Sequence, residues 1–298
     1  MHKQYSIDQS PLYRIVGLNQ LEKRLNIKLN RLDRLLKDGS YRTFLNKKNR
    51  PIQHPVGLLN VVHGKIAYYL ARIRVPDYVY SQKFRSYVDN AYEHKGIHPV
   101  AKTDISKYFP SISKQMVKQM FVEQFKCAKD IAEILANICC FQQKHLPTGS
   151  VISGYVAFFA CKKLFDQIHS HANSAGCSFT LYVDDLTISG SQANRAFLYE
   201  IRKMILSYGL SMSVEKTITY SAYAPKKLTG VIVKYNQCLL PNEQHKTIRD
   251  KKIAIQNAVS EADKVILKKS LKGSLQQAKQ IEKVNAGLID YQPTLIYS

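Results

Sequence analysis

The chain has 298 residues, of which 45% are hydrophobic, enough to bury a sizeable core. It carries 44 lysines and arginines against 22 aspartates and glutamates, a formal net charge of +22. So large a positive charge favours a polyanionic partner, and nucleic acid is the usual one. The sequence has neither a run of 18 apolar residues nor a signal peptide, which argues against the alternative partner, an anionic membrane.

The six cysteines stand at positions 127, 139, 140, 161, 177 and 238, and no pair has the spacing of a zinc ligand or a CxxC motif. This pattern predicts reduced, mostly buried thiols in a cytoplasmic protein rather than a disulfide framework. The nine histidines are scattered along the chain, and we interpret most of them as core or surface residues rather than ligands.

The first half of the chain predicts helices and one hairpin. Leucines at helical spacing indicate an amphipathic helix over residues 17–38, and residues 41–53 have the pattern of a hairpin with a basic tip. Helical patterns follow over 56–73, over 113–140 as one or two helices, and over 150–172.

The second half ends in a helical region. We expect a helix over 192–208, a strand over 211–219, and short strands over 228–233 and 238–240. From Asn242 onward the pattern is helical, with Gly273 as a candidate break. Strands interleaved with helices predict an α+β domain followed by a helical unit that begins near residue 241.

Two adjacent aspartates, Asp184 and Asp185, stand within a short apolar hairpin pattern that runs from Phe179 to Gly190. Apolar residues alternate on both sides of the pair, which predicts strand, tight turn and strand with both carboxylates at the tip. Side-by-side carboxylates that are buried either take up a proton or hold a cation. A solvated Asp-Asp turn is the alternative interpretation.

A third carboxylate, Asp104, comes at the end of an apolar stretch that begins near Pro99. Two strands that deliver three carboxylates to one place provide ligands for two hard cations, and Mg²⁺ prefers such oxygen ligands. Two ions about 4 Å apart can hold the attacking and leaving oxygens of a phosphoryl transfer. The chain has no Ser/His/Asp or Cys/His grouping that competes as a catalytic centre.

Taken in order, these segments resemble a reverse transcriptase. Asp104 to Phe109 is similar to the first palm motif, and Tyr182-Val183-Asp184-Asp185 to the Tyr-x-Asp-Asp motif. Between them, residues 146–153 (LPTGSVIS) resemble the Leu-Pro-Gln-Gly loop, and Gly209-Leu210 with Lys216 resembles the strand-and-lysine motif that follows.

Two shorter motifs resemble the retron enzymes of bacteria in particular. Asn90-Ala91-Tyr92-Glu93-His94 fits their Asn-Ala-x-x-His signature, and Leu228-Thr229-Gly230 resembles their Val-Thr-Gly signature. The chain departs from the family at four positions, which puts its handling of the template in question: Val183 for alanine, Thr148 for glutamine, Gly154 for proline and Phe158 for asparagine.

The resemblance implies a right-hand polymerase fold with fingers, palm and thumb. We expect N-terminal helices and fingers in residues 1–98, the catalytic palm with part of the fingers in 99–240, and a helical thumb in 241–298. The thumb would grip a duplex through its phosphates. An ordinary solvated helix face is the alternative for its basic residues.

The resemblance also implies roles for individual residues. Asp104, Asp184 and Asp185 would bind two Mg²⁺ ions with help from the Ile105 carbonyl, and Lys216 would protonate the leaving pyrophosphate. The residues implied for dNTP binding are Lys47, Lys48, Arg50, Phe109 and Gly149. Phe109 would exclude a 2′-OH, and Gly149 would let the backbone approach a base pair.

Contacts to RNA, template or primer are implied for Pro147, Thr148, Ser150, Asn90, His94, Leu228, Thr229 and Gly230. Other interpretations stay open for several of these residues. Asn90 and His94 could instead brace the junction of fingers and palm, and Leu228-Thr229-Gly230 could be a plain hairpin. Lys216, Lys47 and Lys48 could be ordinary surface lysines, and Phe109 a core aromatic.

The function implied is that of an RNA-directed DNA polymerase of a bacterial retron. Such an enzyme copies a cognate structured non-coding RNA of the msr-msd type into single-stranded msDNA, primed from an RNA 2′-OH, in anti-phage defence. The partners implied are that RNA, its RNA–DNA product, dNTPs and a separate effector protein, with which the enzyme could form an oligomer. The alternatives are another defence-associated reverse transcriptase and a non-catalytic RNA-binding scaffold.

Overall fold

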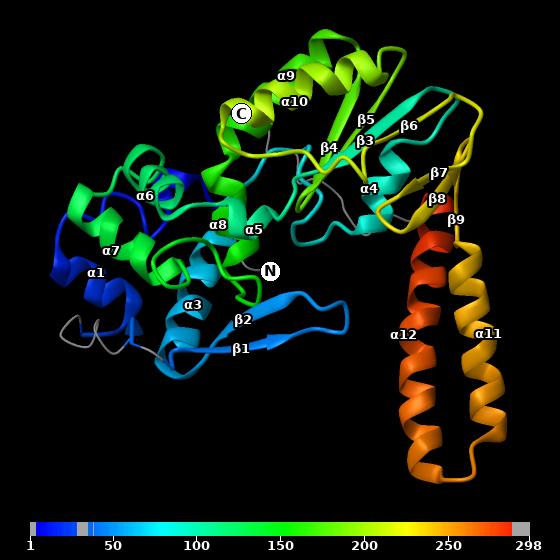
Figure 1. Ribbon diagram of the computed structural model, residues 1–298, viewed down its shortest axis with the longest axis horizontal. Coiled ribbons are helices and arrows are strands. Elements are labelled where there is room, and N and C mark those ends of the chain that lie inside the picture. The colour runs from blue at the N-terminus through cyan, green and yellow to red at the C-terminus, as the bar shows by residue number, and fades with distance from the viewer. Residues whose placement is uncertain (1–3, 29–34, 38, 288–298) are drawn as a thin grey trace. The chain divides into compact units, whose positions relative to one another are not determined.

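The computed structural model describes residues 4–28, 35–37 and 39–287 (Figure 1). Contacts within the chain divide it into two units. The first unit contains residues 1–76, 105–167 and 204–211, and the second contains 77–104, 168–203 and 212–298. Helices accompany antiparallel sheets in the described residues, so the predicted α+β class is confirmed.

The first unit consists mainly of helices with one hairpin. Its elements are η1 Ile7–Gln9, α1 Leu18–Leu25, β1 Tyr41–Leu45, β2 Pro51–Pro55, α3 Gly57–Leu70, α5 Tyr108–Ser111, α6 Lys114–Glu123, α7 Lys129–Cys139 and α8 Ser153–Ala160. The predicted hairpin is confirmed, with Tyr41 opposite Pro55 and Leu45 opposite Pro51. The core of the first unit contains three aromatic rings. The Phe125 ring centroid lies 5.5 Å from that of Phe121 and 5.7 Å from that of Phe159.

The helix predicted over 17–38 is wrong in its length. It ends at Leu25 because Asn26 takes up a left-handed conformation, with φ 57°, and closes the last turn through its N–H to the Glu22 carbonyl. Residues 29–34 and 38 of that prediction lie outside the described residues. The pattern over 150–172 is two helices, α8 and α9 Lys162–Ser174, which separate at Cys161.

The second unit contains the main sheet and the C-terminal helices. Its elements are α4 Tyr87–Glu93, β3 Val100–Asp104, β4 Ser178–Tyr182, β5 Asp185–Ser189, β6 Ile218–Tyr220, β7 Lys226–Leu228, β8 Val231–Lys234, β9 Gln237–Leu239, α11 Asn242–Asn257 and α12 Glu261–Asn285. Helix α9 ends in this unit, and α10 Arg195–Ser207 begins in it. The strands form one antiparallel sheet in the order β4-β5-β3-β6 and another in the order β7-β8-β9.

Three predicted boundaries in this unit are wrong. The strand expected over 211–219 is short, because only its end pairs with β3, as β6. The strand expected over 228–233 is two strands joined by a turn at Thr229-Gly230. The C-terminal helical region breaks at 258–260 rather than at Gly273, which lies inside α12.

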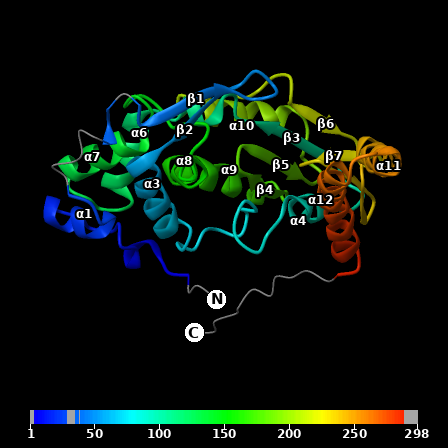
Figure 2. The same cartoon turned by 90° about the horizontal axis from the view of Figure 1, so that it is seen from below.

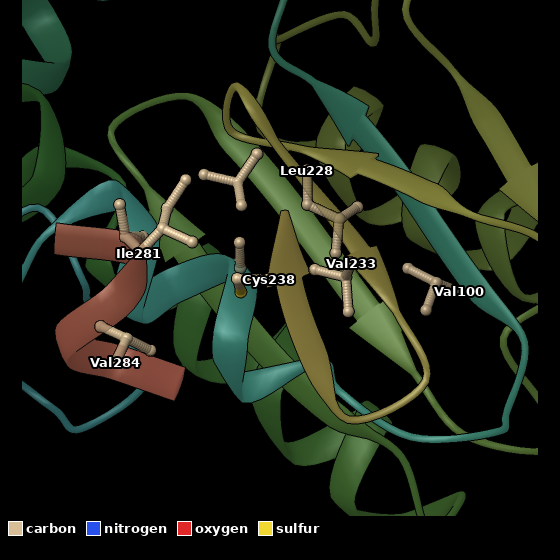
Figure 3. Packing of buried hydrophobic residues seen from close by; sticks show 9 residues of the cluster. Val100, Leu228, Val233, Cys238, Ile281 and Val284 are labelled. Carbon is tan, nitrogen blue, oxygen red and sulfur yellow. The ribbon is translucent and has the colours of Figure 1, made fainter. Parts of the chain in front are cut away.

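The C-terminal helices are tied to the second unit by a small apolar core (Figure 3). Ile281 and Val284 of α12 pack with Leu228, Val233 and Cys238 of the three-stranded sheet. The Asn285 side chain donates to the Cys238 carbonyl and accepts from the Cys238 N–H, at 2.8 and 2.9 Å. Helices α11 and α12 lie side by side along their length (Figure 1), and Figure 2 shows the same pair from below.

No helix among residues 4–28, 35–37 and 39–287 is both long enough and apolar enough to cross a membrane.

Candidate active site

The three predicted metal ligands lie together at one end of the four-stranded sheet. Strand β3 pairs with β5 so that Asp104 lies directly opposite Asp185. Tyr182 is paired with Asp185, so the two-residue turn between β4 and β5 consists of Val183 and Asp184. The pairing of β3 with β5 therefore gathers carboxylates from chain positions about 80 residues apart.

The turn that carries Asp184 has an unusual conformation. Its first residue, Val183, has a φ of 60°, a value that β-branched residues rarely adopt. Two-residue hairpin turns need a positive φ at this position, which glycine usually supplies. The paired strands β4 and β5 therefore maintain a strained conformation directly beside the carboxylates.

The carboxylates are unstable as isolated charges. Asp104 is only 2% exposed. Burial, reinforced by the negative charge of Asp185, raises the pKa of Asp184 to about 6. Burial also raises the pKa of Asp185, although the nearby Lys102 ammonium opposes that shift. A bound cation would relieve both desolvation and repulsion.

The site offers free donor atoms to such a cation. Asp104 Oδ1 is buried and has no hydrogen-bond partner within the described part of the chain. Its other oxygen, Oδ2, accepts a hydrogen bond from the Lys216 ammonium, and this bond raises the pKa of Lys216. Hard oxygen donors that lack partners fit a divalent cation. Among the described residues, no three acidic, histidine or cysteine side chains are already arranged to hold one.

Lys216 reaches Asp104 from the loop that precedes β6. The loop is fixed to β3 by a bond from the Ser213 N–H to the Asp104 carbonyl, at 2.9 Å. The Thr217 hydroxyl adds bonds to Thr103 Oγ1 and the Ser213 carbonyl, at 2.8 and 2.5 Å. The loop therefore keeps an ammonium group beside the carboxylates.

Sequence reasoning missed Lys102, a second lysine at this site. It lies two residues before Asp104 on β3 and is half-buried. Burial lowers its pKa, while the charges of Asp185 and Asp104 oppose that change. Alternate residues of a strand lie on the same face of a sheet. The alternating pattern before Asp104 could therefore have indicated that Lys102 lies near the carboxylates.

The first unit brings the predicted nucleotide-binding hairpin against the Leu-Pro-Thr-Gly loop. Thr148 donates from its N–H and its hydroxyl to Gln53 Oε1 of β2, at 2.9 and 2.8 Å. The same hydroxyl lies 2.6 Å from the Pro51 carbonyl. Thr148 and Gln53 therefore connect the loop to the hairpin. Thr148 departs from the family pattern, and Gln53 was missed by sequence reasoning.

Gly149 allows this approach of loop and hairpin. A Cβ atom at Gly149 would lie 2.7 Å from Ile52 Cγ2 and 2.8 Å from the Gln53 carbonyl oxygen, distances that real Cβ atoms do not show. His54 Nδ1 lies 3.1 Å from the Gly149 carbonyl. The closeness of β2 is what requires a glycine at position 149. The approach of Gly149 to a base pair stays a prediction.

The other loop residues are held from within the first unit. Ser150 Oγ lies 2.7 Å from His63 Nδ1, and Ser153 Oγ donates to the Pro147 carbonyl at 2.5 Å. His63, a further residue that sequence reasoning missed, also places Nε2 2.8 Å from the Ile138 carbonyl. Burial lowers the pKa of His63 to about 4, so the ring is neutral at physiological pH.

The basic tip of the hairpin is exposed. Asn46 Oδ1 accepts from the N–H groups of Lys48 and Arg50, at 2.9 and 3.0 Å, and this shapes the turn. The side chains of Lys47, Lys48 and Arg50 are all exposed. Three exposed cationic side chains on one turn suit a polyphosphate.

The two residues after Asp104 that were assigned roles also belong to the first unit. Ile105 follows Asp104 directly and its side chain is buried. Phe109 lies in the single turn of α5, half-buried, with its ring centroid 5.6 Å from that of Tyr108. Their roles toward metal and sugar stay predictions.

Asn90 and His94 are both completely buried within the second unit. The His94 ring bridges two neighbouring strands, with Nδ1 2.7 Å from Ser189 Oγ of β5 and Nε2 2.7 Å from Thr180 Oγ1 of β4. Among the described residues the side-chain amide of Asn90 has no hydrogen-bond partner. These contacts favour the bracing interpretation, here of α4 against the sheet, and contact with RNA stays a prediction.

Leu228-Thr229-Gly230 forms the turn between β7 and β8. Thr229 and Gly230 have φ values of 43° and 85°, as a two-residue turn with both central residues left-handed requires. Leu228 is buried, and Thr229 Oγ1 donates to the Tyr87 carbonyl at 2.7 Å. This geometry fits the plain hairpin interpretation, and contact of the turn with RNA, template or primer stays a prediction.

Comparison with known families gives one match that covers most of the chain. The sequence profile described as "Reverse transcriptase (RNA-dependent DNA polymerase)" matches residues 28–249. The match includes all three carboxylates, the Leu-Pro-Thr-Gly loop and the hairpin.

Curated relatives are also similar to the chain. The retron Ec86 reverse transcriptase of Escherichia coli is 31% identical over 175 residues, which cover 57% of this chain and 53% of that protein. The retron Se72 reverse transcriptase of Salmonella heidelberg is 29% identical over 252 residues, covering 79% and 66%. The retron Ec48 reverse transcriptase of E. coli is 29% identical over 177 residues, covering 58% and 43%. The matches thus span about half to two thirds of the length of the first two relatives and less of the third.

Proposed function

Because the chain belongs to the reverse transcriptase family, we propose that it is an RNA-directed DNA polymerase of the retron type. The observation that carries the proposal is the register that pairs Asp104 with Asp185 and puts Asp184 in the adjoining turn. The retron type is supported by the similarity to three retron enzymes. The domain assignment implied by the family, with fingers in 1–98, palm in 99–240 and thumb in 241–298, belongs to the same proposal.

Catalysis in this family depends on divalent metal ions, and we propose two Mg²⁺ ions held by Asp104, Asp184 and Asp185. When bound, such ions supply Lewis acidity toward the primer hydroxyl and charge neutralisation toward the triphosphate. The chain contributes carboxylate oxygens at one end of the sheet, because the pairing of β3 with β5 sets Asp104 opposite Asp185 and the adjoining turn carries Asp184.

Lys216 places a protonated ammonium group beside the carboxylates. Its bond to Asp104 holds it there and raises its pKa, so Nζ carries a proton at neutral pH. We assign to it the proton that the departing pyrophosphate takes up. The exposed Lys47, Lys48 and Arg50 would bind the triphosphate, and the half-buried Phe109 would select a 2′-deoxy sugar.

In the cell, the proposed template is a cognate structured non-coding RNA, and the product is msDNA joined to that RNA through a 2′-OH primer. We place this activity in the bacterial cytoplasm, in anti-phage defence together with a separate effector protein. The support for these finer assignments is the likeness to retron enzymes and the Asn-Ala-x-x-His and Leu-Thr-Gly motifs.

The polymerase is tested by extension of a DNA primer on an RNA template with purified protein, dNTPs and Mg²⁺. We expect Asp185→Asn to lower the rate at least 100-fold, because the substitution keeps the shape but removes a charge that a cation needs. The control is Asp130→Asn, an exposed carboxylate in α7, which should leave the rate unchanged. Excess EDTA should stop the reaction, and added Mg²⁺ should restore it.

The retron type is tested in cells that express the gene with its native flanking DNA. An abundant single-stranded DNA that stays joined to RNA until debranching, and that disappears with Asp184→Ala/Asp185→Ala, would support it. Primer extension in vitro without such a product would favour another defence-associated reverse transcriptase. Absence of both activities, with RNA binding retained, would favour a scaffold.

A further inference from the structure

A hollow of about 500 Å³ opens on the surface of the second unit. It lies between α10 and the segment that leads into β6, and its lining includes Arg195, Tyr199, Arg202, Val214 and Ile218. The proposed polymerase function assigns no role to any of these five residues. The volume is within the range of pockets that hold small organic groups.

The residues from α10 form one face of that helix. Arg195, Tyr199 and Arg202 are spaced by four and three residues, which places them in line. The two arginines are two turns apart, roughly 10 Å along the axis, with the tyrosine between them. A cation therefore lies on either side of an aromatic ring.

This face is open to solvent and its arginines are uncommitted. The Tyr199 side chain is 56% exposed, Ile218 40% and Val214 80%. None of the ion pairs formed within the described residues involves Arg195 or Arg202. Exposed apolar surface beside unpaired guanidinium groups marks an interaction site for a ligand that is both flat and anionic.

A further cation lies at the ring itself. Lys203 Nζ is 4.6 Å from the Tyr199 ring centroid, and it forms a 3.2 Å ion pair with Glu200. The hollow also lies at the outer edge of its sheet, since β6 is the last strand in the order β4-β5-β3-β6. The site is thus a basic, aromatic surface at a sheet edge.

We propose that this face, made of Arg195, Tyr199 and Arg202 with the adjoining hollow, binds single-stranded nucleic acid. One base enters the hollow and stacks on Tyr199, while the arginines hold the phosphates on either side of it. The chemistry is shared by RNA and DNA, because every base has a flat face and every linkage a negative charge. The proposal rests on the proposed function only for the identity of the strand, which would be template RNA or DNA product.

The test is photo-crosslinking of the full chain to single-stranded oligonucleotides that contain 5-iodouridine or 5-iododeoxyuridine. A fully paired RNA–DNA duplex without single-stranded overhangs is present in excess, so that the polymerase site is occupied and the proposed face stays accessible. Trypsin cuts after Arg195 and Arg202 and releases residues 196–202, which contain Tyr199, as one peptide. We expect this peptide to carry a crosslink, with RNA alone, DNA alone or both showing which strand is bound.

Substitutions at exposed positions should change the crosslink without unfolding the chain. Tyr199→Ala should lower its yield at least five-fold, and Tyr199→Phe should preserve it, because stacking needs the ring and not the hydroxyl. The matched control is Tyr223→Ala, at a tyrosine that is 71% exposed. Unchanged melting temperatures would show that all three variants fold.

The arginines are tested through salt dependence. Arg195→Gln with Arg202→Gln should reduce the slope of log affinity against log salt by about 1.4, since each phosphate contact with a single strand contributes about 0.7. Lys129→Gln with Lys144→Gln, at two exposed lysines, removes the same charge elsewhere and is the control.

Two results would overturn the proposal: no crosslink on residues 196–202 with either strand, or a crosslink that Tyr199→Ala does not reduce. Binding of a glutamate-rich peptide through Arg195 and Arg202, with no oligonucleotide crosslink, would replace nucleic acid by an acidic protein. The Asp184→Asn variant separates the two proposals, because it should lose polymerisation and keep the crosslink. A variant that still polymerises would count against the proposed active site alone.

Discussion

Individual residues in and beside the main sheet carry strain and buried polarity that packing alone would not select. Val183 has a left-handed φ, Asp104 Oδ1 is buried with no hydrogen-bond partner among the residues that the structure describes, and His94 is buried as a neutral ring. Each feature costs stability, and each lies in or beside the strands that hold the carboxylates. This is the pattern expected where a fold fixes a functional group in place.

Val183→Gly should stabilise the protein by about 1 kcal/mol, because glycine removes the left-handed penalty of a β-branched residue. Urea unfolding measures the change. Val214→Gly is the control, at a valine that does not have a positive φ, and it should not stabilise. If Val183→Gly destabilised the protein as much as Val214→Gly, the turn would not be strained.

His94 should make stability depend on pH. Burial, with a smaller effect of nearby His98, lowers its folded-state pKa to about 3, whereas the unfolded value is near 6.5. The unfolded chain therefore binds the proton more readily, and the stability that is present above pH 6.5 falls as pH decreases toward 3. Between pH 8 and 5 this one group should account for about 2 kcal/mol.

The measurement compares urea unfolding at pH 8 and pH 5. His94→Gln, which cannot titrate, should show a smaller loss of stability at pH 5 than the parent chain. His245→Gln, at an exposed histidine of α11, should behave as the parent does. Equal pH dependence in all three proteins would mean that the His94 ring is not kept neutral by burial.

Among the elements, the contact between the β1–β2 hairpin and the Leu-Pro-Thr-Gly loop joins two segments about 95 residues apart. Thr148 and Gln53 form the contact, and Gly149 leaves room for it. The departure of Thr148 from the family pattern is therefore matched by a glutamine on the neighbouring strand. Under the proposed function, this contact keeps a phosphate-binding tip and a nucleotide-binding loop in a fixed relation.

Thr148→Val should raise the KM for dNTPs several-fold with a smaller effect on kcat, because the loss of the hydroxyl releases the loop from β2. Thr148→Ser keeps the hydroxyl and should retain the parent KM. Steady-state primer extension measures both constants. If valine and serine gave the same KM, the hydroxyl bonds to Gln53 and Pro51 would not position the loop.

The molecule as a whole is dominated by its charge of +22. Such a field attracts any polynucleotide, so sequence-independent contacts with phosphates should supply most of the affinity for RNA. Selection of one RNA must then come from its shape and from contacts with unpaired bases.

Affinity for a structured RNA should fall at least 100-fold between 50 and 200 mM salt, since six or more phosphate contacts release that many counterions. Filter binding at several salt concentrations gives the slope. A duplex DNA of equal length should show a similar slope, because the effect reports phosphates. A nearly flat slope for RNA would indicate that the positive charge of the chain is not used for binding.

Local patterns in the sequence predicted the α+β class, the hairpin over 41–53, the short strand that ends at Asp104, and the three carboxylates as one set. These features depend on periodicity and on residue chemistry, which neighbours in the chain already display. The same patterns misplaced the end of α1, the start of β6 and the break between α11 and α12. Such boundaries depend on single capping residues and on strand partners, to which periodicity does not respond.

Only the tertiary structure decided which distant residues meet. It brought Lys102 and Lys216 to the carboxylates. It also placed Gln53 within hydrogen-bond distance of Thr148, and it buried His94 against Thr180 and Ser189. It also aligned Arg195, Tyr199 and Arg202 with a hollow beside β6. The sequence by itself determined the chemistry that is available, because residue types and local periods are written in it. The pairing of β3 with β5 and β6 decided where that chemistry gathers, because long-range contacts depend on strand register and packing.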